Sequence, residues 1–444
     1  MSVLLLNGAL GPDPLLDDLS ARLRHDFELR GETVDTVLLR IESVSWCQGC
    51  FECWTRTPGV CKINDAGRDL AREFVQADTV VLLTPSRFGS YSAESKKLLD
   101  RTISMLLPFF RRIDGETHHP PRYESRPRFG VLAVLEHDDF DEATTVRVLA
   151  QRNAVNFASP SHHTEIITRH QSPGVALAAC DRLVEALVAP PAPRSPMRHP
   201  DALLPAMARR AAAAPPREAL VLVGSAKPRG ESTSEALGVE LLERLALLGV
   251  SGRLAHVHRD ANDARGLATL AAAVRSVDLL VLATPVYIDS LPWLLTRALE
   301  AIANDRQALL EPPPLAVMML ANCGFPEARH CAVARTIGAL FARDALATWA
   351  GALQLGGGAI VAGRALPEAG QVVARLAPAL DLAARALAAG QRLGDAEIQA
   401  FQEPLVPALA YSAVAGAGWL WTAAHEGAIR RLWERPYRGD GART

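Results

Sequence analysis

The chain has 444 residues, of which 49% are apolar, and carries a formal net charge of −2 with a pI near 6.6. This length predicts two domains of ~100–200 residues each. The near-neutral charge excludes a basic field of the kind that binds nucleic acid. The apolar run at residues 3–6 is too short for a signal peptide, so we expect a cytoplasmic protein.

The first half of the chain alternates short apolar runs with helical patterns. We expect strands at residues 3–7, 33–40, 79–84, 129–136 and 162–168. The helices expected between and after these strands cover about 14–30, 66–76, 93–106, 141–157 and 174–188. This alternation is typical of a doubly wound parallel sheet, and it predicts a first domain over 1–188.

A proline- and alanine-rich linker is expected over residues 189–217. The second half of the chain then shows the same alternation of strands and helices. Its expected strands are 219–225, 251–258, 278–284, 314–322 and 352–358. Its expected helices are about 232–248, 264–275, 292–303 and 327–346. We therefore predict an α/β protein of two tandem domains, the second over 218–400, with a helical extension over 401–444.

A repeated motif supports the duplication. Residues 78–85 read DTVVLLTP and residues 278–285 read DLLVLATP. An apolar run closed by Thr-Pro and followed by a helical pattern predicts a buried parallel strand that feeds a βα loop. Because ligands of open α/β sheets bind at the carboxyl ends of strands, each half contains a candidate ligand edge.

Residues 404–424 carry no charge and are long enough to span a bilayer. They are rich in alanine and glycine, with two prolines near the start. We expect a docked helix that covers the second domain rather than a membrane span.

The loop GSAKPRGESTSEALG at 224–238 has the composition of a phosphate site. It follows an expected strand and enters an expected helix, whose free N–H groups and dipole attract anions. Hydroxyls and two cations gather there: Ser225, Lys227, Arg229, Ser232, Thr233 and Ser234. An ordinary helix N-cap needs one such hydroxyl, so we favour the phosphate interpretation.

Two further loops follow the next strands. TPVYIDSLP at 284–292 offers flat and apolar surface, and ANCGFPEA at 321–328 offers hydrogen-bonding groups for a planar ring. The three loops together predict a mononucleotide site with an aromatic base.

These motifs resemble the flavodoxin-like NAD(P)H-dependent FMN reductase family over about residues 219–360. The resemblance implies flavodoxin-like domains, each a five-stranded parallel sheet with helices on both faces. It assigns the FMN phosphate to the first loop and the flavin ring to the other two. The ring residues are Pro285, Val286, Tyr287, Ile288, Asn322, Cys323, Gly324 and Phe325. It also implies NAD(P)H as co-substrate, a small-molecule electron acceptor (a quinone, nitro or azo compound, or free flavin) and a homo-oligomer. We name no catalytic acid or base, because the flavin carries the chemistry.

The first half resembles the same superfamily, in the branch with WCxGCxxCW. Its segment TPSRFGSYSAESKKLLDR at 84–101 matches the ring loop and the following helix. Its first loop, residues 7–18, departs from the pattern because it lacks serine, threonine, lysine and arginine and adds Asp13, Asp17 and Asp18. Since carboxylates repel a phosphate dianion, we expect this domain to bind FMN poorly.

Four cysteines gather in WCQGCFECWTRTPGVC: Cys47, Cys50, Cys53 and Cys61. Their spacing is similar to that of iron–sulfur flavoproteins, which implies a [4Fe–4S] cluster held by these four residues. The alternative is a packed apolar loop with free thiols, since tryptophan and phenylalanine interleave the cysteines. Both interpretations stay open at this point.

The leading hypothesis is thus an FMN-containing NAD(P)H oxidoreductase whose flavin site lies in the second domain. Two alternatives are an iron–sulfur flavoprotein in electron transfer and a non-catalytic flavin-binding partner module.

Overall fold

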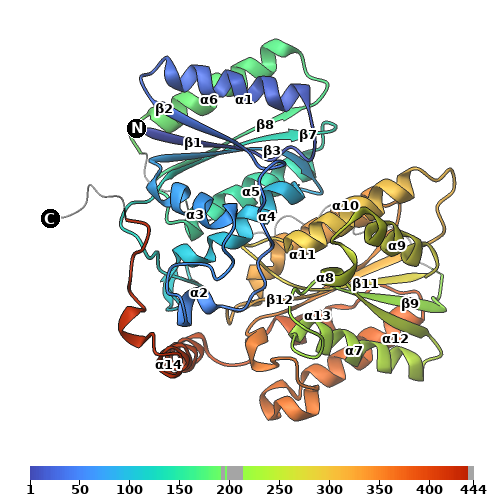
Figure 1. Cartoon of the computed structure of the whole chain (residues 1–444). Helices are drawn as coiled ribbons and strands as arrows, with labels where there is room; N and C mark the ends of the chain where they lie inside the picture. The colour runs from blue at the N-terminus through green and yellow to red at the C-terminus, as the bar shows by residue number, and fades with distance from the viewer. Residues whose placement is uncertain (192–195, 198–213, 439–444) are drawn as a thin grey trace. The chain divides into compact units, whose positions relative to one another are not determined.

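The computed structural model describes residues 1–191, 196–197 and 214–438. The chain divides into two compact units: Met1–Arg198 with Ser412–Thr444 forms unit 1, and His199–Tyr411 forms unit 2. Most of the linker expected at 189–217 lies outside the described residues. Each unit is an α/β sandwich with its own sheet (Figure 1).

The sheet of unit 1 has the strand order β2-β1-β3-β7-β8, and these strands are parallel. Their bounds are β1 Ser2–Asn7, β2 Thr33–Leu38, β3 Thr79–Arg87, β7 Arg128–Leu135 and β8 His162–Thr168. The short β4 (Ser90–Tyr91) pairs antiparallel with the end of β3, and a small hairpin joins β5 (Arg111–Ile113) to β6 (Glu116–His118). Neither antiparallel feature was predicted from the sequence.

Helices cover both faces of this sheet (Figure 1). One face carries α1 (Pro14–Glu28) and α6 (Pro173–Val188), which enclose a core that includes Leu5, Val81 and Leu183. The other face carries α3 (Ala66–Gln76), α4 (Ala93–Leu99) and α5 (Phe140–Asn156). The helix expected at 93–106 changes after Leu99 into a 3₁₀ turn over Asp100–Met105.

Unit 2 repeats this arrangement with the parallel order β10-β9-β11-β12-β13. Its strands are β9 Glu218–Val223, β10 Ser251–His256, β11 Leu279–Pro285, β12 Ala316–Asn322 and β13 Thr348–Leu355. On one face lie α7 (Thr233–Leu247) and α12 (Leu376–Ala388); α13 (Asp395–Gln402) packs against α12 and β13. The short α8 (Val257–Asp260) precedes the helices of the other face, α9 (Ala264–Arg275), α10 (Trp293–Gln307) and α11 (Ala332–Asp344).

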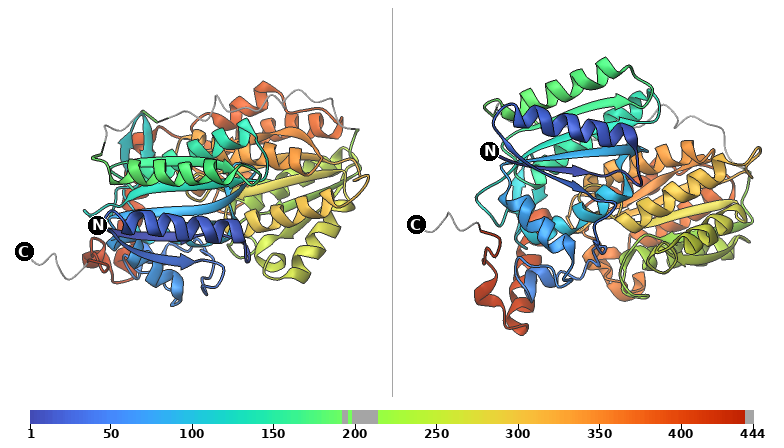
Figure 2. Two further views of the ribbon diagram at one scale, coloured as in Figure 1. Left: turned by 90° about the horizontal axis from the view of Figure 1, so that it is seen from above. Right: turned by 45° about the horizontal axis from the view of Figure 1, so that its top comes forward.

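Both sheets therefore have the strand order 2-1-3-4-5, which is that of flavodoxin-like folds. The predicted fold class is confirmed, and two further views show the same layers in each unit (Figure 2). In this order the chain reverses its winding beside the first strand, so the ligand edge lies where β1 meets β3 and where β9 meets β11.

The repeated motif has the same structural role in both units. The carboxylate of Asp78 accepts the N–H of Ser2 at 2.8 Å, and that of Asp278 accepts the N–H of Arg217 at 2.8 Å. At the other end of each strand, the hydroxyls of Thr84 and Thr284 donate to the following proline carbonyl, each at 2.8 Å. The acid thus fixes the start of the neighbouring strand, and the threonine shapes the turn at the ligand edge.

The C-terminal helix α14 (Ala408–His425) and the residues after it mostly group with unit 1. The ring of Trp419 lies 5.3 Å from that of Phe51 and 5.1 Å from that of Trp54. The expectation that this segment covers the second domain is wrong for the part from Ser412 onward, which groups with unit 1. Hydropathy indicated an apolar segment but not which aromatic surface it packs against. Among the described helices, none has the length and apolar character to cross a bilayer.

Candidate flavin site

The first loop of unit 2 is held in shape by its own hydroxyls. Ser232 is the N-cap of α7, and its Oγ accepts the N–H of Glu235 at 3.1 Å. The Oγ of Ser225 accepts the N–H of Lys227 at 3.2 Å. Both serines are buried, so their hydroxyls organise the turn from within. Thus Ser232 does serve as an ordinary cap, in addition to any contact with a ligand.

The loop carries two cations and one exposed carboxylate, that of Glu231, before the helix begins. Lys227 is half-buried and Arg229 is exposed, and neither forms an ion pair with any residue that the structure describes. The N-terminus of α7 adds its partial positive charge and unpaired N–H groups. An anion that approaches this turn meets two cations and backbone donors.

One carboxylate already binds at the turn. The side chain of Glu235 accepts the N–H of Gly230 at 2.7 Å and lies 3.2 Å from Nε2 of His256. Glu235 is buried in the first turn of α7. Glu235 is a site residue that was not predicted, although the Ser-x-x-Glu spacing of a capping box is present in the sequence.

His258, in α8, adds a titratable group beside the loop. Burial lowers the pKa of its imidazole, and the neighbouring His256 lowers it further; a hydrogen bond with the backbone of Ser225 acts in the opposite direction. The two histidine rings are 5.5 Å apart. His258 therefore favours the neutral form next to the turn.

The second loop contains a strained two-residue turn. Tyr287 and Ser290 exchange both backbone hydrogen bonds, at 2.9 and 3.1 Å. Between them, Ile288 and Asp289 have φ values of 47° and 61°. Two successive left-handed residues define a type I′ turn, which glycine and asparagine normally occupy, so a β-branched isoleucine here is strained. Strain of this kind clusters at ligand sites.

The same turn occurs in unit 1. There β3 and β4 flank Phe88 and Gly89, whose φ values are 60° and 73°. The duplicated Thr-Pro motif thus ends in the same turn geometry twice, with a non-glycine residue in the first left-handed position each time.

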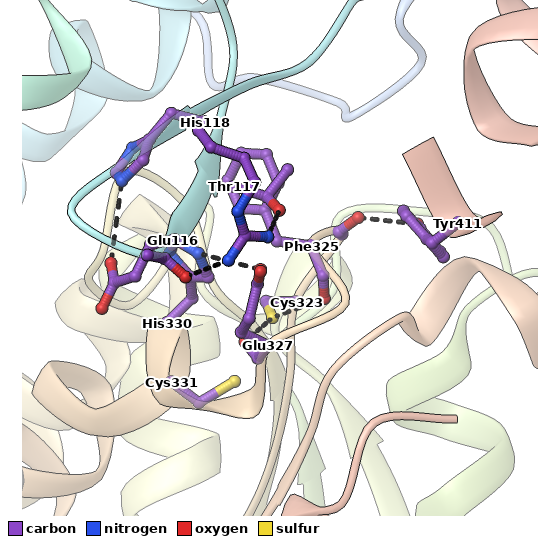
Figure 3. Close-up of polar contacts among 12 residues, drawn as sticks. Glu116, Thr117, His118, Cys323, Phe325, Glu327, His330, Cys331 and Tyr411 are labelled. Carbon is purple, nitrogen blue, oxygen red and sulfur yellow. Dashed lines mark hydrogen bonds and ion pairs between the residues drawn. The ribbon is translucent and has the colours of Figure 1, made fainter. Parts of the chain in front are cut away.

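The third loop is joined to the other two by one side chain. The Nδ2 of Asn322, at the end of β12, donates to the Oγ of Ser234 at 2.8 Å and to the carbonyl of Thr284 at 3.1 Å. Asn322 is buried. The structure therefore brings together the start of α7, the end of β11 and the end of β12, as the sequence analysis expected. The hydroxyl of Tyr411 donates to the carbonyl of Gly324 at 2.7 Å, in the same loop (Figure 3).

A fourth segment, residues 356–363, packs on these loops. The hydroxyl of Thr233 donates to the carbonyl of Gly358 at 2.7 Å. A Cβ at Gly363 would lie 2.6 Å from the carbonyl oxygen of Gly230, so only glycine allows this approach. Glycines at 356 and 358 allow the same close contact, since a Cβ at Gly358 would lie 2.8 Å from Oδ1 of Asn322.

In unit 1, arginines pair with two of the acids of the first loop. Asp13 caps α1 and lies 2.9 Å from Arg169, and Asp17 lies 3.0 Å from Arg40. Burial alone would raise the pKa of Asp13, but the hydrogen bonds from Arg169 and from the backbone lower it overall. The repulsion expected from these carboxylates is therefore partly neutralised by arginines that are distant in sequence. That this unit binds FMN poorly stays a prediction.

The four cysteines of the motif lie in unit 1 next to the aromatic cluster of Phe51, Trp54 and Trp419. Burial raises the pKa of the Cys47 thiol to about 12, and burial followed by the nearby thiols of the motif raises that of Cys53 well above its usual value. Within residues 1–191, 196–197 and 214–438, no group of three or more histidine, cysteine or acidic side chains is placed to hold a metal ion. The arrangement thus fits packed thiols better than a cluster, and we derive no chemistry through iron.

Comparison with known proteins tests these assignments. Residues 1–113 match the model of the NADPH-dependent FMN reductase family. The resemblance predicted from the sequence is confirmed over this part of the chain. The match covers 113 of the 444 residues, and all of them lie in unit 1.

Individual relatives are more distant. The iron–sulfur flavoprotein of Methanosarcina thermophila is 32% identical over 74 residues, which are 17% of this chain and 38% of that protein. The match therefore spans well under half of that relative. Among solved structures, the NAD(P)H:quinone oxidoreductase of Methanothermobacter marburgensis has a TM-score of 0.34 at 14% identity, covering 42% of this chain and 98% of its own. An FMN-dependent NADH-azoreductase of Bacillus anthracis, solved with FMN, has a TM-score of 0.32 at 12% identity, covering 42% and 98%.

Proposed function

We propose that this chain is an FMN-containing NAD(P)H oxidoreductase whose flavin site lies in unit 2. Electrons would pass from the nicotinamide through the flavin to a small acceptor, such as a quinone, a nitro or azo compound, or free flavin. The observation that carries the proposal is the position of Asn322, which links the three candidate loops through Ser234 and Thr284.

The residues at this edge fit the parts of FMN. The N–H groups at the start of α7, with Lys227 and Arg229, suit a phosphate dianion. The half-buried segment 285–288 and the loop 322–325 offer apolar surface and hydrogen-bonding groups to a planar ring. Bound FMN would supply the redox chemistry, while the chain binds, orients and shields it.

Unit 1 has a different part in this proposal. Two acids of its first loop, Asp13 and Asp17, pair with arginines, whereas Lys227 and Arg229 of unit 2 form no ion pair with a described residue. This difference supports a single flavin per chain, in unit 2. Homo-oligomerisation and a cytoplasmic location stay predictions from the sequence.

The test places one charge at the cap of α7. Ser232→Asp keeps an N-cap oxygen for the N–H of Glu235, since aspartate caps as well as serine does, but adds a negative charge where the phosphate would bind. Ser232→Asn is the matched control, because it caps equally well without charge. Flavin is released by heat from the purified full chain and quantified, and NADPH oxidation is measured on the same sample.

We expect wild-type protein and Ser232→Asn to carry about one FMN per chain, and Ser232→Asp to retain about a tenth or less. Full retention of flavin in Ser232→Asp would place the flavin elsewhere and overturn the assignment to unit 2. Wild-type protein that neither binds FMN nor oxidises NADPH would overturn the function itself.

A further inference from the structure

Two buried cysteines of unit 2 lie beside each other, apart from the cysteine motif of unit 1. Cys323 directly follows β12, and Cys331 ends the 3₁₀ turn Ala328–Cys331 and caps α11. One carbonyl, that of Leu355, accepts the N–H of Cys323 at 3.0 Å and lies 4.0 Å from the Sγ of Cys331. The carbonyl of Leu355 therefore places the two cysteines side by side, and both side chains are labelled in Figure 3.

The surroundings of the two sulfurs differ. The hydrogen bond from Cys331 lowers the pKa of Cys323 against the effect of burial, aided by the charge of His330 and the N–H of Phe325. Burial raises the pKa of Cys331 well above its usual value. Cys323 is therefore the sulfur that ionises more readily, and Cys331 is the one that keeps its proton.

The protonated thiol of Cys323 also has hydrogen-bond acceptors nearby. Its Sγ lies 3.4 Å from the carbonyl of Phe325 and 3.5 Å from that of Glu327, so its S–H has acceptors (Figure 3). A sulfur with partners in both forms loses and regains a proton without rearrangement of the loop. Because Cys323 exposes 4% of its surface and Cys331 none, only a small oxidant can reach them.

We propose that Cys323 and Cys331 form an oxidisable dithiol that a hydroperoxide converts to an intramolecular disulfide. The thiolate of Cys323 attacks the peroxide oxygen, an S–O bond forms, the O–O bond breaks, and hydroxide or alkoxide leaves. The sulfur of Cys331 then attacks the sulfenic acid at Cys323; the S–S bond forms, the S–O bond breaks, and the hydroxyl leaves as water with the Cys331 proton. With hydrogen peroxide, the dithiol and one peroxide give the disulfide and two waters.

The bond would close a short loop at the candidate ring site. It would tie the segment after β12, which contains Asn322 and Phe325, to the start of α11. The proposal concerns the thiols alone and does not depend on flavin binding, so it can fail or hold independently of the proposed function.

The sequence offers a direct readout. Trypsin cleaves after Arg306, Arg329 and Arg335, so Cys323 and Cys331 fall in separate peptides, residues 307–329 and 330–335. Reduced full-length protein is treated with stoichiometric hydrogen peroxide, alkylated with N-ethylmaleimide in denaturant, digested and analysed by mass spectrometry. We expect the two peptides to be linked by a disulfide in wild-type protein and in Cys180→Ser, which removes a buried cysteine of unit 1 as a control.

Single variants separate the two roles. In Cys331→Ser, dimedone should trap sulfenic acid at Cys323 about tenfold more than it does at Cys331 in Cys323→Ser. The wild-type measurement stands even if either variant fails to fold. The proposal is overturned if both peptides stay fully alkylated while the exposed Cys50 is oxidised in the same sample.

Discussion

The amide of Asn322 donates to the hydroxyl of Ser234 across 2.8 Å, and through it the end of β12 is joined to the first turn of α7. The same nitrogen donates to the carbonyl of Thr284. Three loops from separate parts of the sequence therefore depend on one buried side chain for their relative placement. This dependence makes Asn322 the first residue to test.

We expect Asn322→Ala to weaken both the fold of unit 2 and flavin binding. The change leaves the carbonyl of Thr284 without this donor, which costs about 1–3 kcal/mol in the free energy of unfolding. FMN affinity should fall about tenfold, because the loops lose their common anchor. Urea unfolding and flavin fluorescence titration measure the two effects. Gln171→Ala removes an exposed amide in unit 1 and should change neither; unchanged flavin affinity in Asn322→Ala would show that the loops are held by other contacts.

The cations of the phosphate loop give a second prediction. Changing Lys227 and Arg229 together to glutamate should lower FMN affinity by about 100-fold at low salt and by less at 1 M salt, since exposed charges are screened. Arg385→Glu is the control, because Arg385 is exposed in the last turn of α12, at the opposite edge of the sheet. Equal losses of FMN affinity in the double variant and in Arg385→Glu would indicate a general effect of net charge rather than a phosphate site.

The framework of both units could be predicted from the sequence because it depends on local patterns. Apolar runs closed by Thr-Pro recur with the spacing of strand and helix, and the strands of the duplicated motif at Thr79 and Leu279 begin within a residue of the expected positions. The three loops of the candidate site were predicted for the same reason, since each directly follows a strand.

Long-range pairings could not be predicted in this way. Lys96, a charged residue within the helix expected at 93–106, is fully buried and lies 2.8 Å from Asp100. Asp13 and Asp17 were interpreted as bare acids, yet they pair with Arg169 and Arg40. The sequence shows which charged residues a segment contains, but the tertiary fold determines which of them form ion pairs.

The histidine beside the phosphate loop predicts a pH effect on stability. The pKa of His258 is lowered in the folded state from about 6.5 in the unfolded chain. At pH values between the lowered pKa of the folded state and that of the unfolded chain, the unfolded state binds more protons. The free energy of unfolding therefore rises with pH across this window and is constant above it. His258→Gln should flatten the increase in the urea midpoint of unit 2 between pH 5 and pH 7. His137→Gln, which changes an exposed site in unit 1, should leave this increase unchanged. An unchanged slope in His258→Gln would assign the pH effect to other groups.

The strained turn predicts opposite effects on stability and binding. Ile288→Asn places a residue that tolerates φ of 47° in the turn, and should raise the free energy of unfolding by about 1 kcal/mol. If the isoleucine packs against the flavin ring, FMN affinity should fall several-fold in the same variant. Ile398→Asn, in the regular helix α13, should only destabilise. A gain in stability with unchanged affinity would show that the strain has no role in flavin binding.

A buried arginine fixes the C-terminal segment to unit 1 and gives the last prediction. The guanidinium of Arg122 donates to the carbonyls of Leu432 and Glu434 at 2.7 and 2.9 Å, and burial lowers its pKa. Arg122→Ala leaves these buried carbonyls without donors and opens a cavity, so we expect a loss of about 3–5 kcal/mol in the free energy of unfolding of unit 1.

Limited proteolysis gives the measurement for Arg122→Ala, since trypsin should cleave faster after Arg430, Arg431 and Arg435 once residues 426–438 are released and unfolded. Arg126→Ala is the matched control, because Arg126 is exposed and, among the residues described, binds only the carbonyl of Glu124. Equal resistance of the two variants would mean that the aromatic contacts, such as the stacking of Trp433 on Phe109 at 5.5 Å, hold the segment without the arginine. Faster cleavage in Arg122→Ala alone would make this residue the anchor of a segment whose position hydropathy failed to predict.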